Sequence, residues 1–101
     1  MIIHSERFLS GMGFRFLLNA ALTTEAFSIS ILWSAIRIVY APIMSIARVA
    51  ITQGRLRNEM SIIYYDTNNH LHTRYIFVNE PDRWIDAFRG LDVPVIITDE
   101  R

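Results

Sequence analysis

The chain has 101 residues, no cysteine, and ten basic side chains balanced by ten acidic ones, so its formal net charge is zero. This length fits a single domain, residues 1–101, and supports a hydrophobic core without disulfide or metal cross-links. Because cysteine is absent, thiol nucleophiles and thiolate metal sites are excluded, and the absence of lysine excludes a P-loop and Schiff-base chemistry. Neutrality also argues against a general electrostatic attraction to nucleic acid or anionic lipid.

The N-terminal segment lacks the features of an export signal. His4, Glu6 and Arg7 interrupt it, and no long apolar run with a small-residue cleavage site follows. A cytoplasmic protein is therefore expected. Residues 14–22 are apolar without a clean period, which predicts a strand and leaves a helix open as the alternative.

Residues 26–44 form a long apolar stretch that raises the question of a membrane span. Arg37 lies in the middle of it and would cost about 2.5 to 3.5 kcal/mol at a bilayer centre. Pro42 falls inside its far end, and many of its residues are β-branched and alternate in polarity. Adjoining strands are therefore favoured, and a small membrane-associated protein with a hydrophobic segment near 26–44 is the alternative.

Alternation inside this stretch predicts a β-hairpin. Three large apolar residues share one face of residues 27–31, with serines on the other face. A turn at residues 33–35 would join this strand to a second one. There the apolar phase moves to even positions, so the predicted apolar face of the second strand carries Ile36, Ile38 and Tyr40.

The second half of the chain predicts a further strand at residues 46–52 and then a second hairpin. Apolar residues alternate over residues 60–64, and the turn-forming side chains of residues 66–69 follow. On the returning strand one face carries Leu71, Thr73, Tyr75 and Phe77.

One helix is predicted near the C-terminus. Asn79 can cap it, Pro81 suits its first turn, and Gly90 offers a stop. Its apolar stripe, expected to anchor the helix on the sheets, consists of Trp84, Ile85, Phe88 and Leu91. Residues 93–98 follow as a short extended tail in an edge or unpaired position.

Four sequence phrases are similar to those of the bacterial pleckstrin-homology-like and GRAM-like domain family. Their order and spacing, rather than any single phrase, carry the resemblance, which covers about residues 14–91. The phrases are ALTTE at residues 21–25, IVYAPIMSI at 38–46, SIIYYD at 61–66 and PDRWIDAF at 81–88.

The resemblance implies an α+β, mainly β fold: an antiparallel barrel or sandwich of about seven strands, capped by one C-terminal helix. Residues 92–101 would be a short extension of that pattern. Members that bind phosphoinositides use several basic residues on the first hairpin, whereas residues 10–15 offer only Arg15. Lipid headgroup binding is therefore not expected, and the bacterial relatives imply a scaffold for protein contact or self-association.

The composition also points to self-association. About half of the chain is apolar, and a domain of this size has a limited interior. Both faces of residues 62–65 are apolar, so one face is expected to meet a partner. The predicted interaction surface consists of Ile43, Met44, Ile63 and Tyr65, and the predicted state is a homo-oligomer, with a different protein partner as the alternative.

No catalytic residue, metal site or cofactor is predicted. His70 and His72 would share one face of a strand near Asp66, but a convincing third ligand is lacking. No serine lies in a nucleophile elbow. Five aromatic residues could stack on single-stranded nucleic acid, but a neutral chain favours core packing for them: Trp33, Tyr40, Tyr64, Tyr65 and Tyr75. A small-ligand-binding domain or an enzyme would require a polar pocket that the sequence does not identify.

Overall fold

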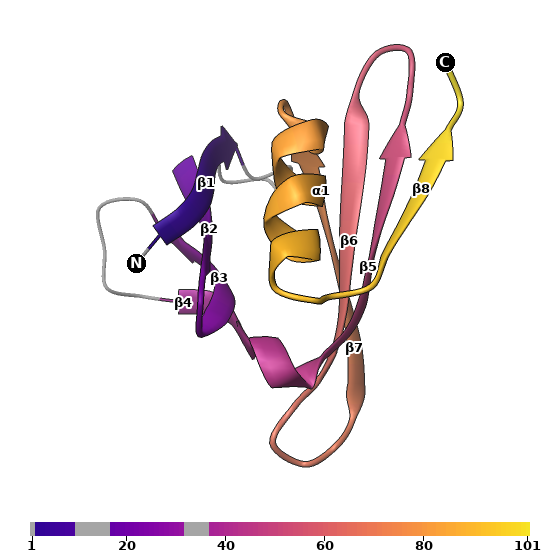
Figure 1. Ribbon diagram of the computed structural model, residues 1–101. Coiled ribbons are helices and arrows are strands. Elements are labelled where there is room, and N and C mark those ends of the chain that lie inside the picture. The colour runs from indigo at the N-terminus through magenta and orange to yellow at the C-terminus, as the bar shows by residue number, and fades with distance from the viewer. Residues whose placement is uncertain (1, 10–16, 32–36) are drawn as a thin grey trace.

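A computed structural model describes residues 2–9, 17–31 and 37–101 of the chain, which form two β-sheets and one α-helix (Figure 1). The mainly β, α+β class expected from the sequence is confirmed. Residues 14–16 of the first expected strand and the expected turn at 33–35 lie outside the described residues. The elements are β1 (Ile2–Leu9), β2 (Leu17–Thr23), β3 (Ala26–Ile31), β4 (Arg37–Pro42), the 3-10 turn η1 (Ile43–Ser45), β5 (Ile46–Gln53), β6 (Asn58–Tyr65), β7 (Leu71–Val78), α1 (Pro81–Gly90) and β8 (Val95–Asp99).

The strands divide between the sheets in chain order, apart from the last one. The first sheet has the order β1-β2-β3-β4, with every neighbouring pair antiparallel. The second sheet has the order β7-β6-β5-β8, in which β8 pairs with β5 in parallel. Chain reversals by hairpins explain the antiparallel pairs, whereas the return through α1 allows a parallel one.

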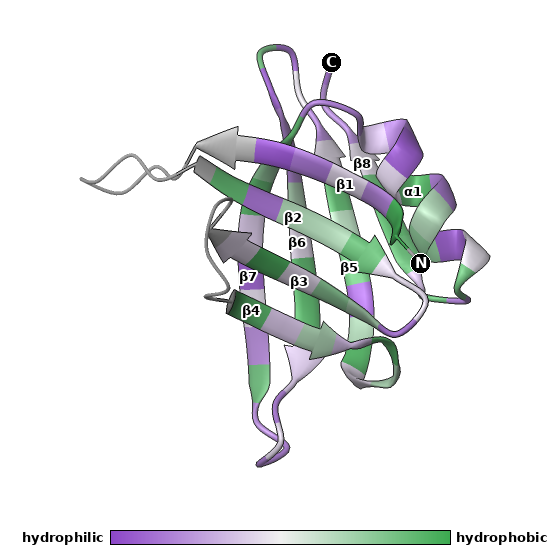
Figure 2. Ribbon diagram, turned by 90° about the vertical axis from the view of Figure 1, so that its left-hand side faces the viewer, coloured by the Kyte–Doolittle hydropathy of each residue, from purple (hydrophilic) through white to green (hydrophobic). Residues whose placement is uncertain are grey.

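The core lies between the facing sheets and is closed by α1 on one side (Figures 1 and 2). Strand alternation puts one face of each sheet into this space. The largest fully buried side chains come from both sheets and from the helix: Phe27, Leu22, Val49, Ile51, Met60, Ile62, Trp84 and Phe88.

Strand β1 was not expected from the sequence, and its inward face explains why. Glu6 is buried at 8% exposure, and His4 is half-buried. The inward positions of β1 are thus polar, so the sequence lacks the alternating apolar residues by which a strand is recognised. The Glu6 carboxylate accepts hydrogen bonds from the backbone N–H groups of Asn79 and Glu80, both at 2.9 Å. The inward face of β1 therefore holds the entry to α1.

The start of α1 corrects the expected cap. The N-cap residue is Glu80 rather than Asn79, and it makes no side-chain capping bond. Pro81 occupies the first turn, where a missing N–H costs nothing. Along the helix Trp84, Ile85 and Phe88 are buried, and Leu91 packs partly buried just beyond its end.

Strand β4 presents the face opposite to the predicted one. Val39 and Ala41 are buried, whereas Ile38 and Tyr40 are 51% and 47% exposed. The pairing with β3 is regular here: Val39 lies opposite the buried Ile29, and Tyr40 lies opposite Ser28 on the outward face. The prediction of an inward Ile38 and Tyr40 is therefore wrong, because alternation in hydropathy identifies two faces of a strand without saying which one meets the core.

The C-terminal tail is a paired edge strand, one of the two positions expected for it. Asp92 adopts a positive φ of 60° after the helix, a conformation that Asp tolerates better than most residues. Val93 is buried, and the Val49 N–H donates to the Pro94 carbonyl at 2.9 Å. This reversal sets β8 beside β5 as an edge strand of the second sheet.

Candidate interaction surface

The second sheet has one face that no described element covers (Figure 1). Its residues alternate with the inward-facing ones along each strand, and Ser61 in its middle is itself buried at 9% exposure. We call this set the outer face: Arg48, Ala50, Thr52, Glu59, Ser61, Ile63, Tyr65, Leu71, Thr73, Tyr75, Phe77, Ile96 and Thr98.

Cross-strand pairing arranges the outer face in rows. In the central row Ile96 of β8 lies beside Ala50, Ala50 beside Ser61, and Ser61 beside Tyr75 of β7. Two large apolar side chains thus flank two small ones, which makes the middle of the face shallow.

Large apolar side chains on this face are extensively exposed. Tyr75 is 67% exposed, Leu71 57%, Ile96 52%, Phe77 47% and Tyr65 43%. The guanidinium carbon of Arg57 lies 4.3 Å from the centre of the Phe77 ring, a cation–π arrangement. The face therefore combines aromatic surface with few charges.

The opposite sheet provides an internal comparison. In the middle of its outward face Asn19 pairs with Ser30, and Ala21 pairs with Ser28. These small or polar side chains suit contact with water. Ile38 and Tyr40 are exposed on the edge strand β4 of that sheet, so the two sheets differ in the middle of their outward faces, where large apolar side chains are found on the second sheet.

The four residues of the predicted interaction surface differ in exposure and in the elements that carry them. Ile63 and Tyr65 lie on the outer face, with Ile63 half-buried. Ile43 packs against the core from η1, and Met44 beside it is fully exposed. The aromatic centre of the outer face, Tyr75, was not included, because its alternation on β7 was interpreted without knowing which face is inward.

Core packing of the aromatic residues was predicted too broadly. Tyr64 is 7% exposed and belongs to the core, whereas Tyr40, Tyr65 and Tyr75 are each more than 40% exposed. Trp33 lies outside the described residues. The prediction is wrong for the three exposed tyrosines, because the core volume between the sheets is filled by aliphatic residues, Trp84 and phenylalanines.

A cluster of polar residues surrounds the start of α1. His4, Glu6 and Glu80 offer ligand atoms within 4.8 Å of one another, as a cation would require. However, both Glu6 oxygens accept backbone N–H bonds, and Glu80 pairs with Arg83 at 3.0 Å. A cation here would compete with the Arg83 guanidinium, so the cluster is best explained as an anchor for the helix.

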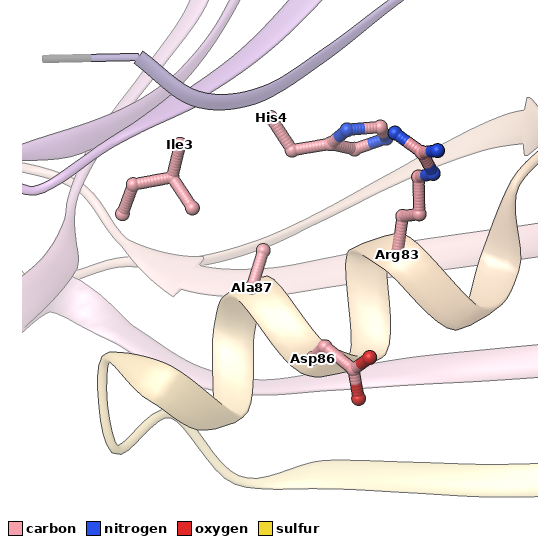
Figure 3. Close-up of a pocket in the computed structure, with 5 residues that line it drawn as sticks. All are labelled: Ile3, His4, Arg83, Asp86 and Ala87. Carbon is pink, nitrogen blue, oxygen red and sulfur yellow. The ribbon is translucent and has the colours of Figure 1, made fainter.

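An open cavity of about 390 Å³ adjoins this cluster (Figure 3). The Arg83 side chain extends toward the His4 ring at one end, and the Asp86 carboxylate points away from both. The two charged groups do not converge on one point, so the cavity offers no acid–base pair.

The β6–β7 turn is organised by Asp66. Its Oδ1 accepts the backbone N–H groups of Asn68 and His70, and its Oδ2 lies 2.7 Å from His72 Nε2. These bonds, above all the His70 N–H followed by the His72 side chain, lower the pKa of Asp66 to about 2. His70 Nδ1 is 3.9 Å from the same carboxylate. The three side chains therefore stabilise the turn, and the Asp66 oxygens that a metal would need already accept hydrogen bonds.

No protein-family model and no curated protein matches this chain. Among the described residues, no helix combines the length and hydropathy needed to cross a bilayer. Most of the 26–44 stretch that raised this question lies in β3, β4 and η1.

Proposed function

We propose that this chain is a non-catalytic binding module that acts through protein contact, with a second copy of itself as the partner. The observation that carries the proposal is the outer face, on which Leu71, Tyr75 and Phe77 are all widely exposed. Contiguous exposed apolar patches on small proteins typically mark interaction sites. Aromatic residues are also enriched at the centres of protein interfaces.

The resemblance to pleckstrin-homology-like domains supports the same function. Two facing sheets followed by a C-terminal helix agree with the arrangement that the resemblance implies, and β8 is an addition to it. Because one fold serves many functions, the outer face rather than the fold carries the argument.

The charges of the outer face favour a second copy over an unrelated partner. Arg48 lies one row to one side of the central Ala50–Ser61 pair, and Glu59 lies one row to the other side. A two-fold axis along the central row would bring Arg48 of each copy near Glu59 of the other. Such self-complementarity is what an isologous interface requires.

Light scattering during size-exclusion chromatography at micromolar concentration tests the proposal. We expect a mass well above the 11.7 kDa of one chain. Tyr75→Glu should restore the monomeric mass, since it places a charge at the centre of the interface. The matched control is Ile38→Glu, which introduces the same charge on the other sheet and should leave the mass unchanged. A monomeric wild-type protein would overturn self-association.

A charge exchange tests the two-fold arrangement itself. Arg48→Glu should weaken self-association, because it opposes Glu59 of the second copy. Adding Glu59→Arg to this variant should recover it. If the double variant stays as weak as the single one, the two copies do not meet in this orientation.

A further inference from the structure

A second concave site lies where the first sheet passes into the second. It is a cavity of about 400 Å³ with a mainly apolar lining. Its size falls within the usual range of small-molecule sites. It is lined by Tyr40 and Pro42 of β4, Ser45 of η1, and Tyr64, Tyr65 and Asp66 where β6 enters its turn.

The lining combines aromatic residues with one carboxylate. Three of the residues are tyrosines, and none of the described lining residues is basic. The face of a tyrosine ring carries negative electrostatic potential and attracts cations. Anionic ligands, by contrast, would be repelled by Asp66.

The carboxylate is ionised and fixed in place. Its two backbone N–H bonds, at 2.8 and 2.9 Å, hold Oδ1, and His72 holds Oδ2. The lowered pKa of Asp66 keeps it charged at any physiological pH. A metal ion is a poor match, because a single carboxylate whose oxygens already accept three bonds offers too few ligands.

The tyrosines differ in how they are held. The Tyr64 ring is buried and stacks on His72, with ring centres 5.5 Å apart. Tyr65 is 43% exposed, so part of its ring remains accessible to a ligand. Rigid aromatic residues beside an anion suit a bulky cation that water solvates weakly.

We propose that this cavity binds an alkylammonium group, either a quaternary ammonium or a protonated amine. Tyr65 supplies aromatic surface, and Asp66 supplies the opposite charge. The group could belong to a soluble amine or to a choline lipid headgroup, and the chemistry of recognition is the same for both. The site is separate from the central row of the outer face, so it does not depend on self-association.

Titration with choline, followed by amide chemical shifts, tests the site. We expect saturable shifts confined to residues 40–45 and 64–67, with a dissociation constant on the order of millimolar. The control ligand is 3,3-dimethyl-1-butanol, which has the shape of choline without its charge. It should bind at least about tenfold more weakly if the cation is recognised. Equal binding of the two ligands, or no saturable shift up to about 50 mM choline, would overturn the proposal.

Variants separate the ring and the charge from the fold. Tyr65→Leu should weaken choline binding about five- to thirtyfold, whereas Tyr65→Phe should retain it, because either aromatic ring attracts a cation. Asp66→Asn keeps an oxygen for the two turn amides but removes the charge, so it should also weaken binding. Leu56→Ala changes an exposed apolar residue at the β5–β6 turn, away from the cavity, and serves as the control. Unchanged affinity in both Tyr65→Leu and Asp66→Asn would contradict the site.

Two further measurements define the ligand source and the independence of the site. Co-sedimentation with phosphatidylcholine vesicles that is lost in Tyr65→Leu would assign a lipid headgroup, and free choline binding without vesicle binding would assign a soluble amine. The Tyr75→Glu variant should still bind choline. Loss of choline binding in that variant would overturn the separation of this site from the interface.

Discussion

Replacing Glu6 by Gln should destabilise the protein strongly, although the change is nearly isosteric. The carboxylate of Glu6 is buried and accepts two backbone N–H bonds of 2.9 Å at the entry to α1. A hydrogen bond to a charged group contributes about 1.5 to 3 kcal/mol, and an unsatisfied buried donor costs about 1 to 3 kcal/mol. The amide of Gln keeps one acceptor and turns an NH₂ group toward the other donor, so we expect a loss of about 2 to 4 kcal/mol.

Thermal and urea unfolding followed by circular dichroism measure this loss. For a domain of about 100 residues, it corresponds to a fall in Tm of roughly 10 to 30 °C. Glu25→Gln is the matched control, since Glu25 is exposed in the β2–β3 turn and should change stability by less than about 0.5 kcal/mol. If Glu6→Gln is as stable as Glu25→Gln, β1 does not anchor α1 through this carboxylate, and the explanation of its polar inward face fails.

Three further predictions follow from the core, the turn and the charge. Trp84→Ala should cost about 3 to 5 kcal/mol in urea unfolding, because Trp84 is fully buried between Phe27 and Phe88, and an unmoved midpoint would contradict its role. The contribution of the ionised Asp66 to stability is present above about pH 4 and is lost as pH falls toward 2. Asp66→Asn should therefore reduce the loss of stability measured between about pH 4 and pH 2. The remaining loss is due to Asp99, whose pKa Arg101 lowers to about 2. Co-sedimentation with anionic vesicles should be weak and lost in moderate salt, and binding that persists at about 0.5 M salt would refute the argument from zero net charge.

Local patterns were sufficient to predict much of the fold. Alternation over residues 60–64 and the turn at 66–69 predict the β6–β7 hairpin, because register and turn chemistry act within a few residues. The stripe of Trp84 and Phe88 likewise follows from helical periodicity. Both features depend on neighbours in sequence.

Features that depend on distant residues were missed. The inward face of β1 is polar because Glu6 bonds to residues more than seventy positions later. The parallel pairing of β8 requires the position of α1 and the free edge of β5, neither of which a short window contains. The faces of β4 follow from its register with β3, in which Tyr40 lies opposite Ser28 and Val39 opposite Ile29. In each case the decisive partner lies outside the pattern being interpreted.

The candidate surfaces were predictable only in part for the same reason. Composition indicates that some apolar residues remain exposed, and the apolar residues on both faces of 62–65 predict that one face meets a partner. The exposure of Tyr75 and Phe77 could not be separated from burial, because alternation identifies two faces without saying which one meets the core. The position of the first sheet decides which face of the second sheet is inward.

Both proposed sites use strand β6, and the geometry makes them compatible. Tyr65 lies two rows from the central Ala50–Ser61 row, which is four residues or about 14 Å along the strand. A dimer centred on that row therefore leaves Tyr65 at its rim, where side chains stay accessible to solvent. If the second copy instead covered Tyr65, linkage would require choline to favour the monomer. A dimer mass that does not change with choline concentration thus supports the central-row axis, and dissociation by choline would place the interface over the cavity.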